Sequence, residues 1–169
     1  MYGRYTKVML ANRLSTLLFA VTVFASATLM FLVEPMVARM VLPVAGGAPM
    51  VWNSCVVFFQ AVLLGGYWYA RFLTVKAGRQ RLALHAVVLL LPVAFLPLSI
   101  RADAPAPGAN PMPWLIAALT GAVALPFFVL ATTASLFQRW FADTTSHWSH
   151  NPYLLYACSN LGSVLALLA

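Results

Sequence analysis

Long apolar segments are the feature of this chain that most constrains its fold. Five segments contain no Asp, Glu, Lys or Arg, and they cover residues 14–33, 51–69, 82–99, 114–137 and 153–169. About 20 apolar residues in a helix are enough to cross the hydrocarbon core of a bilayer. Only 8% of all residues are charged, whereas a soluble domain carries about a quarter charged residues. We therefore predict an all-α, polytopic transmembrane helix bundle, a single domain over residues 1–169, with four full spans and a fifth at the C-terminus.

The distribution of basic residues predicts the orientation of these spans. If the N-terminus is cytoplasmic, the inner segments hold eight Lys and Arg residues and the outer segments hold only Arg39 and Arg101. Cytoplasmic loops of membrane proteins carry such an excess of Lys and Arg. The net charge of +7 is therefore explained by orientation, and no separate basic face is left for nucleic acid. The expected partner of the chain is the lipid bilayer, and nucleic acid is not expected.

Polar side chains recur at helical spacing inside two predicted spans. Asn53, Gln60 and Tyr67 follow one another at intervals of seven residues, and Tyr156 and Asn160 are four residues apart. Each set therefore shares one face of a helix. Two explanations are open: such residues form hydrogen bonds between packed membrane helices, or they line a path for a substrate.

The apolar pattern is interrupted between the first two predicted spans. We predict an outer connection over residues 34–50, with a short interfacial helix over residues 36–42 between two prolines. One explanation is a structured loop in which Glu34 and Arg39 pair with each other or with a neighbouring helix. The alternative is a binding vestibule at the outer mouth.

A vestibule of this kind would suit an organic cation such as a polyamine. Cations are bound by carboxylates and by the faces of aromatic rings. Glu34, Trp52 and Tyr156 supply these groups. The remaining candidate residues are Arg39, Asn53, Gln60 and Asn160.

The sequence contains none of the common catalytic motifs. There is no nucleophile elbow, zinc-protease motif, P-loop or dinucleotide-binding glycine motif. His147 and His150 are accompanied only by Asp143, so a polar inner loop is expected there rather than a metal site. Cys55 and Cys158 lie in predicted spans and are expected to be free thiols. We expect no catalytic residue, no cofactor and no metal in this chain.

Three stretches of the sequence resemble a known family. "EPMVARMVLPVAGGAPMVWNSCVVFFQAVLLGGYWYA", which begins at Glu34, resembles the start of the bacterial fused major-facilitator/spermidine-synthase proteins. "PFFVLATTASLFQRWFA" followed by "PYLLYACSNLGSVLALL" resembles the next two helices of the same proteins. The resemblance implies the N-terminal membrane region of such a protein, placed in the bacterial inner membrane. It also implies a following soluble domain like an aminopropyltransferase, which these 169 residues do not contain.

Three functions are therefore considered. The first is a membrane module that anchors or serves a synthase-like domain or partner. The second is a small transporter, or part of one, for polyamines or other organic cations. The third is an accessory or assembly subunit of a membrane complex. A homo-oligomer or a larger membrane complex is compatible with each of them.

Overall fold

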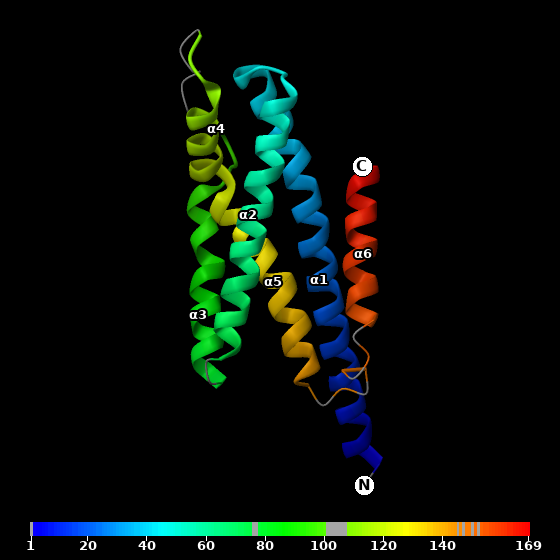
Figure 1. Ribbon diagram of the computed structural model, residues 1–169. Helices are drawn as coiled ribbons and strands as arrows, with labels where there is room; N and C mark the ends of the chain where they lie inside the picture. Colours follow the sequence, from blue (N-terminus) through cyan, green and yellow to red (C-terminus); the bar gives the residue numbers. More distant parts are fainter. Residues whose placement is uncertain are drawn as a thin grey trace. The chain divides into compact units, whose positions relative to one another are not determined.

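The structure is a computed structural model that describes residues 2–75, 78–100, 108–144, 146, 148–149, 151 and 153–169. Over these residues every regular element is a helix and no strand is present, which confirms the predicted all-α fold. In chain order, the elements are α1 (Tyr2–Ala45), α2 (Pro49–Thr74), α3 (Gly78–Leu90), η1 (Leu91–Phe95), α4 (Pro111–Leu119), η2 (Thr120–Ala124), α5 (Leu125–Ala142) and α6 (Tyr153–Leu168) (Figure 1).

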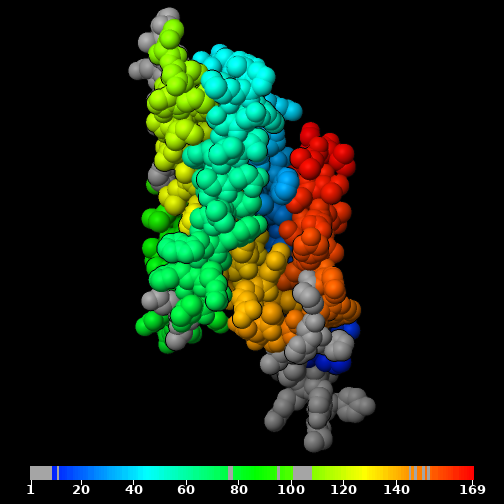
Figure 2. Space-filling model, in the orientation of Figure 1, coloured from blue at the N-terminus to red at the C-terminus, as the bar shows by residue number. Residues whose placement is uncertain are grey.

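Three helical stretches within the described ranges are long and apolar enough to cross a membrane. They cover Asn12–Ala45, Pro49–Thr74 and Pro111–Ala142, so they contain the first, second and fourth predicted spans. Helix α6 is also apolar but has 16 residues. The number of passes thus stays a prediction. Helix α2, coloured cyan to green, lies at the surface along its length (Figure 2).

The third predicted span, over residues 82–99, is not one regular helix. Helix α3 ends at Leu90, and the 3₁₀ helix η1 follows over Leu91–Phe95. Pro92 accounts for this change, because it has no backbone N–H and disfavours the α conformation at the residue before it. The apolar segment therefore changes its helical geometry at the proline.

Helix α1 corrects the predicted boundary between the first two spans. We expected a connection to begin at Glu34, but α1 continues through both of its prolines to Ala45. Proline is tolerated within membrane helices because neighbouring groups satisfy the carbonyl that it frees. The separate helix predicted over residues 36–42 is therefore part of α1. The helix is followed by Gly46, whose φ of 89° is the left-handed conformation that ends many helices.

The segment from Pro111 to Ala142 is a continuous helical run with a π turn inside it. The side chain of Asn110 caps its start by accepting a hydrogen bond from the N–H of Met112 at 3.0 Å. The π turn η2 directly precedes Leu125 and Pro126. Pro126 donates no hydrogen bond to the preceding turn, and a π turn is a common way for a membrane helix to continue past such a residue.

Contacts divide the chain into two compact units, each of which is described by itself. Unit 1 consists of Met1–Phe31 and Thr133–Ala169, and unit 2 consists of Leu32–Thr132. Helices α1 and α5 contribute residues to both units.

Unit 1 is built where α6 and the end of α5 pack with the first part of α1. Its hydrophobic cluster is centred on Val23, Phe141 and Leu155. The ring of Phe19 lies 5.5 Å from the rings of Phe137 and Phe141. Helices α1 and α6 approach closely at Gly162, where a Cβ atom would lie only 2.6 Å from the carbonyl oxygen of Phe24. Such close approach of membrane helices requires small residues at the contact.

Unit 2 is built around aromatic residues of α2 and the first part of α5. The ring centroid of Phe59 lies 4.7 Å from that of Phe127, and both side chains are buried. Gly66 of α2 faces α5, and a Cβ atom there would lie 3.1 Å from the Cβ atom of Ala131. The two helices are therefore in close contact at this glycine.

Candidate functional site

The residues proposed from the sequence are divided between the two units. Glu34, Arg39, Trp52, Asn53 and Gln60 belong to unit 2, and Tyr156 and Asn160 belong to unit 1. Among them only Glu34 is half-buried, and the other side chains are exposed. The structure therefore places the predicted polar stripes of α2 and α6 on outward faces of their own units.

Glu34 lies within α1 rather than in a loop. Its carboxyl group is close enough to the thiol of Cys55 on α2 for an electrostatic interaction between them. Both Glu34 and Arg39 are described, and no ion pair joins them. Two side chains five positions apart point to different sides of one helix, which explains why Glu34 and Arg39 do not pair with each other, one of the possibilities that the sequence left open.

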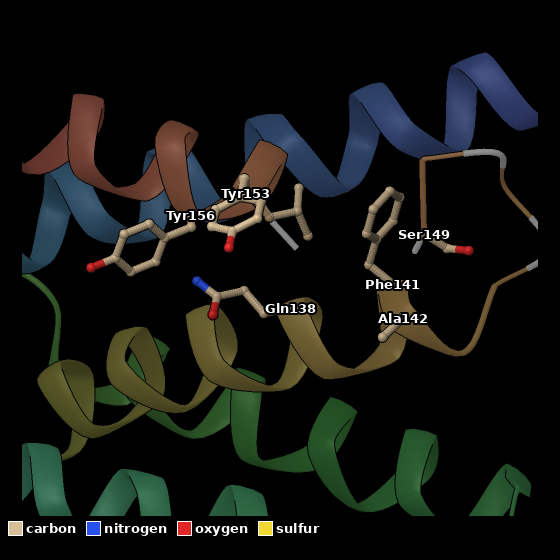
Figure 3. A pocket seen from close by; sticks show the side chains of 7 residues that line it. Gln138, Phe141, Ala142, Ser149, Tyr153 and Tyr156 are labelled. Atoms are coloured by element: carbon tan, nitrogen blue, oxygen red, sulfur yellow. The ribbon is translucent and has the colours of Figure 1, made fainter. Parts of the chain in front are cut away.

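A depression in unit 1 gathers aromatic and polar side chains between α5 and α6. We call it the aromatic depression; its volume is about 330 Å³, and it is lined by Gln138, Phe141, Ala142, Ser149, Tyr153, Leu155 and Tyr156. Gln138 extends from α5 toward the two tyrosines of α6 (Figure 3). Tyr153 and Tyr156 are 76% and 60% exposed, so the depression is open at the tyrosines.

Hydrogen bonds of the loop between α5 and α6 fix one wall of the aromatic depression. The hydroxyl oxygens of Ser146 and Thr16, on α1, lie 2.9 Å apart. Ser149 donates its hydroxyl to the carbonyl oxygen of Ser146 at 2.7 Å. At the start of α6 the side chain of Asn151 accepts a hydrogen bond from the N–H of Tyr153 at 3.1 Å. The first of these bonds attaches the loop to α1, and the last caps the first turn of α6.

The chemistry of the aromatic depression is that of a polar aromatic binding surface. None of the described residues that line it is charged. Two tyrosine rings offer apolar faces with hydroxyl groups, and the amide of Gln138 offers both a donor and an acceptor. Tyrosine combines a large apolar contact with a polar tip, which is why it is frequent in binding interfaces. The arrangement can bind a peptide segment or a cationic group.

Several of these residues were not identified from the sequence. Tyr156 was predicted, but Gln138 and Ser149 fell in a segment interpreted as a connection, and Tyr153 was read only as the start of a span. One feature of the sequence could have identified Gln138. It is a polar residue at the end of an apolar span, and the next helix begins with a tyrosine. The residues of α5 and α6 become neighbours only because the loop between the two helices reverses the direction of the chain.

His85 of α3 was also missed. Its side chain is only 1% exposed, and its ring centroid lies 6.2 Å from that of Tyr69 on α2. The ring of Tyr69 in turn lies 5.5 Å from that of Phe128. A histidine within an apolar segment is uncommon in membrane proteins and could have been recognised from the sequence.

Cys55 and Cys158 were expected to be free thiols, and the structure agrees. A separate question is whether the described residues include a possible metal site. Cys55 is buried, Cys158 is half-buried, and both are free. Over the described part of the chain no three His, Cys, Asp or Glu side chains gather as metal ligands. His147 and His150 lie outside the described residues, so the expectation for that loop is not tested.

Comparison of the chain with models of protein families, with curated proteins and with solved structures finds no match. The function is therefore inferred from the sequence and from the geometry of the two units.

Proposed function

We propose that this chain is a multi-pass module of the bacterial inner membrane that anchors or serves a synthase-like domain or partner. The sequence resembles the fused major-facilitator/spermidine-synthase proteins, in which the membrane helices precede a soluble domain like an aminopropyltransferase. The observation that carries the proposal is the aromatic depression, which is lined by two exposed tyrosines of α6 and by Gln138 of α5. Exposed aromatic residues around a hollow are typical of the side chains that contribute most to protein–protein binding.

The predicted orientation puts the aromatic depression on the cytoplasmic side of the membrane. The loop over residues 138–152 is predicted to be cytoplasmic, because the basic residues favour a cytoplasmic N-terminus. A soluble synthase-like domain on the same side of the membrane could contact the aromatic depression directly. The first turn of α6 would then form part of the docking surface.

The helices also leave much of their own surface for other partners. In the most apolar windows of Asn12–Ala45 and Pro49–Thr74, only 28% and 22% of the residues are buried. Membrane helices with such a small buried share complete their packing against lipid or against other proteins. A module that works within a larger assembly is compatible with this small buried share.

If the synthase-like partner is a separate polypeptide, a substitution in the aromatic depression tests the proposal. We expect Tyr156→Ala to lower recovery of a synthase-like protein with the tagged chain by about tenfold or more, because an interface tyrosine often contributes over 1.4 kcal/mol. The measurement is quantitative mass spectrometry after purification in mild detergent. Asn160→Ala, an exposed change on the same helix outside the depression, is the control. Equal recovery with both variants would contradict a docking role for the depression.

Transport of an organic cation is the second candidate, and the position of Glu34 favours it. This carboxyl group lies inside α1 and is half-buried, and acidic residues within membrane helices commonly mark ion or substrate paths. We expect Glu34→Gln to reduce uptake of labelled spermidine into vesicles by at least about tenfold, while Glu34→Asp retains uptake. Uptake that is the same in wild type and Glu34→Gln would reject this candidate.

A further inference from the structure

The outward face of α2 carries a regular seam of exposed residues. Alternating steps of four and three residues connect Asn53, Val57, Gln60, Leu64, Tyr67 and Arg71. We call this set the α2 seam. All of its members are exposed; Val57, Leu64 and Tyr67 are 67%, 69% and 50% exposed. A repeat of seven residues with two contact positions is the pattern by which helices pair in a left-handed coil.

The α2 seam is separate from the face of α2 that packs inside unit 2. The buried residues of the helix are Val51, Cys55, Phe58, Phe59, Gly66, Ala70 and Leu73. They lie on the opposite side of the helix from the seam. The buried residues of α2 thus exclude the seam, whose members are all exposed.

Lipid alone is a poor environment for this face. Asn53 and Gln60 each carry an amide with two donors and an acceptor. In a bilayer, polar groups on a helix surface are stabilised by hydrogen bonds to another helix. The apolar residues Val57 and Leu64 alternate with these amides, so the face as a whole resembles a helix–helix contact.

We propose that the α2 seam binds the α2 seam of a second copy of this chain, with the two helices parallel. Copies with the same orientation in a membrane are related by a two-fold axis along its normal. This axis places Gln60 opposite Gln60 and Asn53 opposite Asn53 at equal depth. An amide is complementary to itself because it both donates and accepts, and a polar residue at one contact position fixes the register of such a pair.

The remaining members of the α2 seam are compatible with a two-fold contact. Val57 would meet its equivalent between the two amide layers, and Leu64 would meet its equivalent between the layers of Gln60 and Tyr67. Arg71 lies in the last turn of α2, where its long side chain can extend to the membrane surface. An open depression of about 430 Å³ beside the seam, lined by Met50, Asn53, Ser54, Val57 and Ile116, leaves room for side chains of the second copy.

Cysteine cross-linking in native membranes tests this contact. We expect Val57→Cys and Leu64→Cys to give a disulfide-linked product of twice the subunit mass under mild oxidation. Val87→Cys is the matched control, because Val87 is 58% exposed on α3 and lies outside the seam. The unmodified chain, which retains Cys55 and Cys158, measures the background. Equal cross-linking at Val57 and Val87, or products that contain only another protein, would overturn the proposal.

A second variant tests the amides themselves. Gln60→Leu should lower the dimer association constant by about 3- to 30-fold, which corresponds to the strength of interhelical hydrogen bonds in membranes. Gln60→Asn keeps the amide and should retain more of the association. The constant is measured by energy transfer between labelled copies in vesicles. Stronger or unchanged association of Gln60→Leu would also overturn the proposal, whatever the outcome for the synthase-like partner.

Discussion

Replacing Gly162 with alanine is expected to destabilise unit 1 strongly. The new Cβ atom would lie 2.6 Å from the carbonyl oxygen of Phe24 and 2.8 Å from the hydroxyl oxygen of Thr28. The first of these atoms belongs to the backbone and cannot rotate away, so α6 must move away from α1. Overpacking of this kind costs about 1–3 kcal/mol, and occasionally more. Thermal unfolding in detergent, followed by circular dichroism, should show a midpoint lower by several degrees.

Two other glycines provide a graded control for this result. At Gly66 the nearest atom to a new Cβ is the Cβ of Ala131 at 3.1 Å, and at Gly65 it is an atom of Phe128 at 4.0 Å. Gly66→Ala should therefore have a smaller effect than Gly162→Ala. Gly65→Ala should be neutral or stabilising, because alanine favours a helix by about 0.5–1 kcal/mol over glycine. If the three variants unfold at the same temperature, the close packing described at Gly162 is wrong.

Replacing Phe59 with alanine is expected to have the largest effect in unit 2. The Phe59 side chain is 1% exposed, and its ring lies 4.7 Å from Phe127 and 5.5 Å from Phe58. Truncation removes buried contacts on α2 and leaves a cavity that the fixed helices can fill only partly. Phe→Ala changes in cores cost about 3–5 kcal/mol. The free energy of unfolding in micelles is the quantity to compare with wild type.

The matched control for this variant is on the same helix. Phe72 is 48% exposed, so Phe72→Ala removes the same atoms from a side chain that is far less buried than Phe59. Its expected effect on the free energy of unfolding is below about 1 kcal/mol. A loss at Phe72 equal to the loss at Phe59 would show that the aromatic contacts of unit 2 do not stabilise it.

The all-α fold could be predicted because long uncharged segments permit few other structures in lipid. Helix ends were harder to predict, and proline was the main reason. In α1 the chain remains helical beyond Glu34 despite its prolines, whereas Pro92 coincides with the change from α3 to η1. A proline disturbs the helix locally, but neighbouring groups decide whether the helix continues. The sequence alone does not show which groups lie next to each proline in the folded chain.

The candidate site could be predicted only in part for a similar reason. The spacing of Asn53, Gln60 and Tyr67 correctly placed them on one face, since helical geometry fixes this relation. It could not show that this face points outward, because that depends on the helices packed on the other side. Gln138 and Tyr153 lie on opposite sides of a connection that is attached to α1 by the contact between the hydroxyl groups of Ser146 and Thr16. Contacts of this kind leave no periodic pattern in the sequence.

The central claim is that this membrane module works with a synthase-like domain, and the native gene product tests it most directly. We would purify it from its own membranes in mild detergent and measure the intact mass of every polypeptide in the complex. The proposal predicts a synthase-like domain, either in a polypeptide larger than the 18.4 kDa of this sequence or in a stoichiometric partner. A polypeptide of 18.4 kDa that is recovered with no synthase-like domain would contradict the proposal.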